Sequence, residues 1–136
     1  MKKLLLIGLL LAFYACRNRD GVIPYVPFDI NINIQNPQYN KLNGLGGWVY
    51  VSAGSRGLIV FRSDFNTFVA LDRHSTYKPE RTCAIVFVDD NNITATDTCS
   101  GSVFQLMDGS PMNGPATIGL QQYRTSFDGN IIRIWN

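Results

Sequence analysis

Cysteine and histidine do nucleophilic and metal chemistry most readily, and this 136-residue chain has one histidine, His74, and three cysteines, Cys16, Cys83 and Cys99. His74 is adjacent to Ser75, so a Ser–His–Asp triad made from this pair would require the imidazole to point at its own neighbour. One histidine and two cysteines that we expect to be oxidised cannot fill a tetrahedral zinc site. The sequence therefore predicts no catalytic residue and no metal site, with His74 a solvated side chain in a polar loop.

The first residues resemble a bacterial secretory signal. A lysine pair precedes an apolar run over residues 4–15, which is too short to span a bilayer permanently. Cys16 follows directly, and the junction resembles a lipobox, in which the cysteine thiol receives a diacylglycerol before cleavage. We therefore expect residues 1–15 to be removed as a signal peptide and Cys16 to be the lipidation site. A buried helix that ends in a core cysteine is the alternative.

Lipidation implies a protein held on a membrane through its acyl chains. Residues 16–28 would then comprise the lipidated cysteine and a tether, because Pro24 and Pro27 interrupt any long helix or central strand. We expect a location in the cell envelope, on the periplasmic side or at the cell surface, with the outer membrane as the expected membrane.

The charge balance argues against nucleic acid as a partner. The full chain has 12 Lys and Arg against 10 Asp and Glu. Loss of Lys2 and Lys3 with the signal would leave the two signs equal. Without a basic cluster, nothing supplies the contacts to phosphate that dominate nucleic-acid affinity.

The remainder of the chain has the pattern of short strands. Ile30, Ile32 and Ile34 alternate with asparagines, which places the apolar side chains on one face. Further β-rich runs separated by Gly, Asn and Asp turn signals cover residues 48–51, 58–61, 68–71, 84–88, 103–106, 120–123 and 131–135. We expect a single all-β domain over residues 29–136, arranged as a sandwich or barrel of antiparallel strands.

The spacing of the last two cysteines around a turn predicts that they are neighbours. Residues 89–92 read Asp-Asp-Asn-Asn, a turn signal between two of the β-rich runs. A hairpin centred near Asn91 would place Cys83 opposite Thr98 or Cys99. An exported protein resides where disulfides form and persist, so we expect a Cys83–Cys99 disulfide. Two reduced cysteines, buried as small apolar residues, are the alternative.

The segment after Cys99 resembles the second ligand loop of the Rieske iron–sulfur domain. In that family the first loop carries Cys-x-His, and the second carries Cys-x-x-His-Gly-Ser-x-Phe followed by Asp-Gly and then Gly-Pro-Ala. The matching residues of this chain are Gly101, Ser102, Phe104, Asp108, Gly109, Gly114, Pro115 and Ala116. The resemblance covers residues 45–136 and implies a Rieske-like domain of stacked antiparallel sheets with remnants of two ligand loops.

The same resemblance implies that the cluster ligands are lost. Counting back from Gly101, the histidine position holds Ser100 and the cysteine position holds Asp97, and the first loop has Ser75 and Tyr77 at its ligand positions. A Rieske cluster needs two cysteines and two histidines, and the chain has one histidine. Some family members carry a disulfide cysteine at the position of Cys99. The resemblance therefore implies that the chain has kept the disulfide between the two loops and lost the iron–sulfur cluster.

We expect these four degenerate positions to face one another across the two loops, with hydroxyl groups donating to the Asp97 carboxylate. A structural hydrogen-bond network of this kind satisfies buried polar groups. The alternative is a small binding pocket or a hard-cation site on Asp97, for which one carboxylate is a poor basis because calcium takes six to eight oxygens.

The sequence thus favours a non-enzymatic, lipid-anchored module of the cell envelope with no cofactor, which interacts with an envelope protein or has a structural role. It leaves the oligomeric state and the partner open. One alternative is a [2Fe–2S] electron-transfer protein with unusual ligands or histidines borrowed from a partner. Another is a glycan-binding lipoprotein that stacks sugars on exposed aromatic side chains. The candidate aromatic residues are Tyr25, Tyr39, Trp48, Tyr50 and Trp135.

Overall fold

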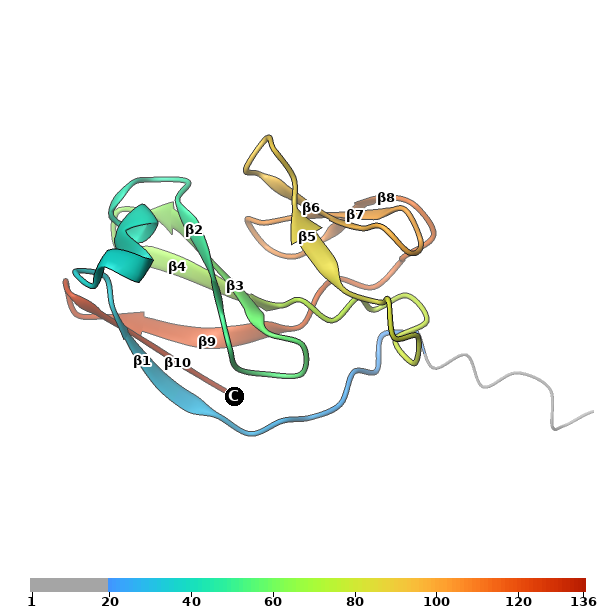
Figure 1. The fold of residues 1–136 in the computed structure, drawn as a ribbon, viewed down its shortest axis with the longest axis horizontal. Helices are drawn as coiled ribbons and strands as arrows, with labels where there is room; N and C mark the ends of the chain where they lie inside the picture. Colours follow the sequence, from blue (N-terminus) through green and yellow to red (C-terminus); the bar gives the residue numbers. More distant parts are fainter. Residues whose placement is uncertain (1–19) are drawn as a thin grey trace, which may run out of the picture.

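The computed structural model describes residues 20–136 (Figure 1). The expected signal peptide, Cys16 and the first part of the expected tether lie outside the described residues. The elements are β1 (Asp29–Asn33), the 3-10 helix η2 (Pro37–Asn43), β2 (Trp48–Val51), β3 (Leu58–Asp64), β4 (Thr67–Asp72), β5 (Val86–Val88), β6 (Thr94–Asp97), β7 (Ser102–Gln105), β8 (Pro111–Asn113), β9 (Gln122–Phe127) and β10 (Ile131–Trp135). Among the described residues, no helix is long and apolar enough to cross a membrane.

The strands form two antiparallel sheets, which confirms the prediction of an all-β domain. The larger sheet has six strands in the order β1-β10-β9-β4-β3-β2, and it curls so that its edge strands β1 and β2 line a common groove. The smaller sheet has four strands in the order β5-β6-β7-β8. Its strands come between β4 and β9 in the sequence, and β4 and β9 pair with each other. The chain therefore leaves the larger sheet after β4, forms the smaller sheet and returns to the larger sheet at β9.

Strand β3 explains how the two sheets share apolar surface. Its first four residues are all buried, and successive side chains point to opposite faces of a strand. Leu58 and Val60 pack into one core, with Ile32 and Ile134 of the larger sheet. Ile59 and Phe61 pack into a second core, which is completed by side chains of the smaller sheet. An uninterrupted apolar run therefore marks a strand covered on both faces.

Two strands and one helix were not predicted from the sequence. Strands β6 and β8 have few apolar residues, and they are strands because each pairs with β7. The helix η2 begins at a proline and buries only Leu42. Strands β6 and β8 are defined by pairing with the adjacent strand β7, and η2 is defined by packing Leu42 into the first core, so the apolar periodicity of these segments gives little indication of them.

The described part of the expected tether, residues 20–28, is held against the domain at both ends. The Asp20 carboxylate accepts a hydrogen bond from the Lys78 amide at 3.1 Å, and Gly21 N donates to Thr76 O at 2.7 Å. Near β1, the Phe28 amide donates to the Asn136 side chain at 3.1 Å. Residues 20–28 consequently run along the molecule.

Candidate functional site

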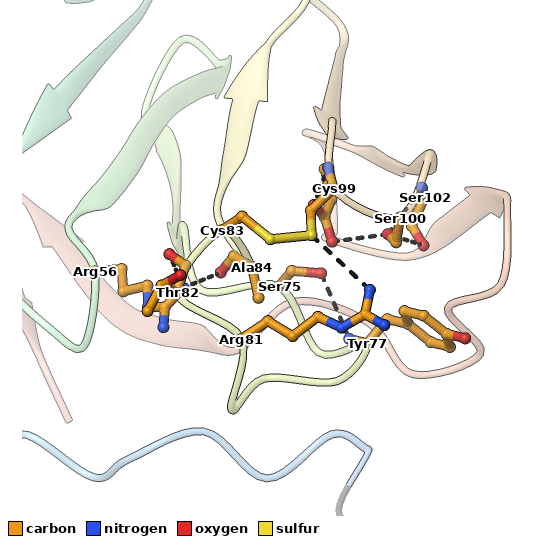
Figure 2. The surroundings of a disulfide bond; sticks show 11 residues. Arg56, Ser75, Tyr77, Arg81, Thr82, Cys83, Ala84, Cys99, Ser100 and Ser102 are labelled. Carbon is orange, nitrogen blue, oxygen red and sulfur yellow. Dashed lines mark hydrogen bonds between the residues drawn. A yellow bond between two sulfur atoms is a disulfide. The ribbon is translucent and has the colours of Figure 1, made fainter.

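Two loops at one end of the molecule carry the residues singled out by the sequence. The connection between β4 and β5 holds Ser75, Tyr77 and Cys83, and the β6–β7 turn holds Cys99. Cys83 and Cys99 form a disulfide with their Cα atoms 5.7 Å apart, which confirms the predicted pairing. Figure 2 shows this bond joining the two loops.

The ladder that leads to the disulfide is close to the expected hairpin. Strands β5 and β6 pair Val86 with Asp97. Continuing that register would place Cys83 opposite Ser100, one position beyond Cys99. The ladder ends at Val86, however, so the backbone at Cys83 has left the sheet and its sulfur meets the neighbouring cysteine.

Asp97 organises the second loop. Its side chain is fully buried, and its carboxylate accepts hydrogen bonds from Cys99 N at 2.9 Å and from Ser100 Oγ at 2.7 Å. The Ser100 hydroxyl lies 2.9 Å from Ser102 Oγ, which also accepts from Ala116 N at 3.1 Å. The serines and the aspartate thus close a tight turn and fasten it to the segment after β8.

Ser75 and Tyr77 do not join that network. Ser75 is fully buried, and its Oγ accepts a hydrogen bond from the Tyr77 amide at 3.4 Å within the same loop. The Tyr77 ring packs against the second core. In the described part of the chain, the hydrogen bonds to the Asp97 carboxylate come from its own loop. The expected network across both loops is therefore wrong, because each loop satisfies its own polar groups.

The contacts between the two loops involve sulfur. Besides the disulfide, Arg81 extends its guanidinium to 3.9 Å from Cys99 Sγ. Every buried side-chain nitrogen and oxygen among residues 20–136 has a hydrogen-bond partner. At this end of the domain the two loops are thus joined by a disulfide, and their buried polar side-chain atoms are hydrogen-bonded within the protein.

The donor set at these positions does not suit an iron–sulfur cluster. The four positions offer oxygen atoms, whereas a Rieske cluster is held by two thiolates and two imidazoles. Cys83 and Cys99 are bonded to each other, so neither offers a thiolate. Within residues 20–136, no group of three or more His, Cys, Asp or Glu side chains is placed to hold a metal ion.

His74 is buried, so its assignment as a solvated side chain is wrong. It is 3% exposed, with Nε2 2.7 Å from Pro79 O and Nδ1 2.8 Å from Ser55 Oγ. A carbonyl only accepts, so Nε2 carries the proton and Nδ1 accepts from the Ser55 hydroxyl. Burial lowers the pKa of His74, and Arg56 lowers that pKa further against the opposing effects of Pro79 O and Asp72.

The lowered His74 pKa predicts a loss of stability in mild acid. The unfolded chain binds the proton near the usual pKa of 6.5, and the native state resists it, so the free energy of unfolding falls as the pH drops below that value. Urea unfolding of the wild type at pH 7.5 and pH 5.5 should show this decrease. His74→Gln cannot titrate and should lose less stability over the same interval. Equal losses in both proteins would contradict the prediction.

Asp72 at the end of β4 was missed by sequence reasoning and has the most hydrogen bonds of the buried carboxylates. It is fully buried and accepts from Ser55 N at 2.6 Å, Arg56 N at 3.2 Å, His74 N at 2.8 Å and Tyr123 OH at 2.8 Å. Burial raises the pKa of Tyr123, and Asp72 raises it further. The available signal was a carboxylate that directly follows the apolar run Phe68–Leu71, since a carboxylate at the end of a buried strand must itself be buried and hydrogen-bonded.

The candidate aromatic residues do not form one stacking surface. Of the five, only Trp48 and Tyr50 pair with each other, at 4.9 Å between ring centroids. Trp48 Nε1 donates to Asn92 Oδ1 at 2.8 Å, and Tyr50 OH accepts from Val88 N at 2.9 Å. These polar atoms connect the larger sheet to the smaller one, so the pair holds the two sheets together.

No protein-family model matches the chain, and no curated protein matches its sequence. What the protein does must therefore be inferred from its own residues and their geometry.

Proposed function

We propose that the chain is a lipid-anchored, extracytoplasmic protein with a Rieske-like fold that holds no iron–sulfur cluster. It acts as an interaction or structural module of the cell envelope and not as an enzyme. The Cys83–Cys99 disulfide carries this proposal. It uses both cysteines of the domain in a covalent cross-link, and disulfides persist in oxidising compartments outside the cytoplasm.

The placement of the two loops supports the Rieske resemblance. The two segments that the resemblance identifies as ligand loops lie side by side at one end of the domain, where a disulfide of sequence separation 16 joins them. The residues at the four ligand positions make turn hydrogen bonds within their own loops. These loops therefore serve to shape and stiffen the end of the domain.

Within residues 20–136, the hydroxyl–imidazole pair of Ser55 and His74 is poorly suited to nucleophilic catalysis, which supports a non-enzymatic role. The Ser55 hydroxyl donates to Nδ1 of His74, but the imidazole is buried and its pKa is lowered by that burial, which makes it a weaker base. The Ser55 amide donates to Asp72 and so is not free to stabilise a developing oxyanion.

Iron and sulfide analysis tests the proposal. We expect protein purified anaerobically from iron-supplied cells to contain neither in stoichiometric amount, and to give no Rieske-type electron paramagnetic resonance signal when reduced. A double Cys83→Ser, Cys99→Ser variant is the matched control, since iron retained equally by both proteins is not bound through these cysteines. Stoichiometric iron and sulfide in the wild type would overturn the proposal, and their loss in the variant would identify these cysteines as the ligands.

A further inference from the structure

The first described residues lie at the end of the domain where the disulfide joins the two loops. Asp20 and Gly21 are hydrogen-bonded to Lys78 and Thr76 of the β4–β5 connection, and Figure 1 shows the first described residues beside this loop. Gly21 has a φ of +87°, and a Cβ there would lie 2.5 Å from Ile118 Cδ1. The left-handed backbone favours glycine at this position, and the Ile118 side chain packs close to it, so packing and hydrogen bonds together hold the point at which the chain joins the domain.

The proposed lipidation site is only four residues before this fixed point. Consecutive Cα atoms are 3.8 Å apart, so Cys16 lies within about 15 Å of Asp20 whatever the conformation between them. A headgroup layer is roughly 5 to 8 Å thick. A domain of about 100 residues has a radius of gyration of about 13 Å. The space that remains between this end of the domain and the bilayer is too small for another protein.

The surface around Asp20 has the composition of a membrane-interface contact. Val22 and Ile118 are 72% and 45% exposed, which offers apolar side chains beside the fixed point. Arg81 is exposed and Lys78 half-buried in the same connection. Apolar side chains together with cations suit the boundary between headgroups and acyl chains. The acidic Asp20 and Glu80 balance the two cations, so anionic lipid adds little attraction.

We propose that this end of the domain, defined by Val22, Lys78, Arg81 and Ile118, rests on the headgroup surface of the membrane that holds the anchor. The disulfide-linked loops then face the lipid, and the β9–β10 turn at the other end of the molecule (Figure 1) faces away from it. This inference rests on the proposed lipid anchor at Cys16. The orientation follows from the short connection between Cys16 and Asp20 and does not depend on attraction between charged side chains and lipid.

Headgroup quenching tests the orientation in the full chain, produced in cells and reconstituted into vesicles of phosphatidylethanolamine and phosphatidylglycerol. A fluorophore is attached through an azido amino acid at Glu80 in one variant and at Asn130 in the other, both of which are exposed. With nitroxide-labelled headgroups, we expect several-fold stronger quenching at position 80 than at position 130. The difference should survive 0.5 M salt, because the tether and not charge sets it.

A spacer variant and a labelling control distinguish the outcomes. Inserting a 20-residue Gly/Ser segment between Arg19 and Asp20 should abolish most of the difference in quenching. Incorporation of an alkyne fatty acid by the wild type, absent in Cys16→Ala, establishes the anchor separately. Labelled protein with equal quenching at both positions would overturn the orientation alone. Wild type without the fatty acid would overturn the anchor and, with it, this inference.

Discussion

Replacing Asp72 with alanine should lower the free energy of unfolding by about 4 kcal/mol. The change removes the acceptor of three backbone amides and the Tyr123 hydroxyl, and an unsatisfied buried donor costs about 1 to 3 kcal/mol. The Ser55 and Arg56 amides are only partly buried, so water can replace part of what is lost there. Urea unfolding would measure the change.

Two further variants separate the bonds to Asp72. Tyr123→Phe removes one donor and leaves the carboxylate with its backbone partners, so we expect a loss of about 1 kcal/mol. Asp72→Asn keeps the size but offers one accepting oxygen, so its loss should fall between the other two. Hydrogen exchange at Ser55 and Arg56 should accelerate in Asp72→Ala and not in Tyr123→Phe. A loss below 1 kcal/mol in Asp72→Ala would show that the turn over residues 53–57 does not depend on this carboxylate.

Removing the disulfide should cost about 3 kcal/mol. Cys83 and Cys99 have a sequence separation of 16, and closing a loop of that length restricts the unfolded chain by roughly this amount in the chain-entropy model. We expect the Cys83→Ser, Cys99→Ser double variant to unfold at a correspondingly lower urea concentration. The wild type unfolded with reductant should show the same loss.

Reductant is also the control for this second prediction. The double variant has no bond between the loops to reduce, so its unfolding curve should be the same with and without reductant. A wild type that is equally insensitive to reductant would contradict the disulfide as a source of stability. Because Asp97 keeps its own hydrogen bonds in either case, the β6–β7 turn should persist when the loops separate.

The sequence by itself determined the features that depend on short-range order. Alternation around Ile32 and the apolar run that begins at Leu58 predicted strands, because side-chain direction in a strand has a period of two residues. The Asp-rich turn predicted that the chain reverses near Asn91 and brings Cys83 close to Cys99, which is enough for the disulfide although the register of the β5–β6 ladder is shifted by one residue from a direct Cys83–Cys99 pair.

Only the tertiary structure decided which polar groups became partners. Tyr123 reaches Asp72 across 51 residues because β9 pairs with β4, and His74 is buried because Ser55 and Pro79 enclose it. Nor could residue spacing show that Ser75 and Asp97 bond within separate loops. Each of these outcomes depends on how distant segments pack, and local periodicity carries no information about that packing.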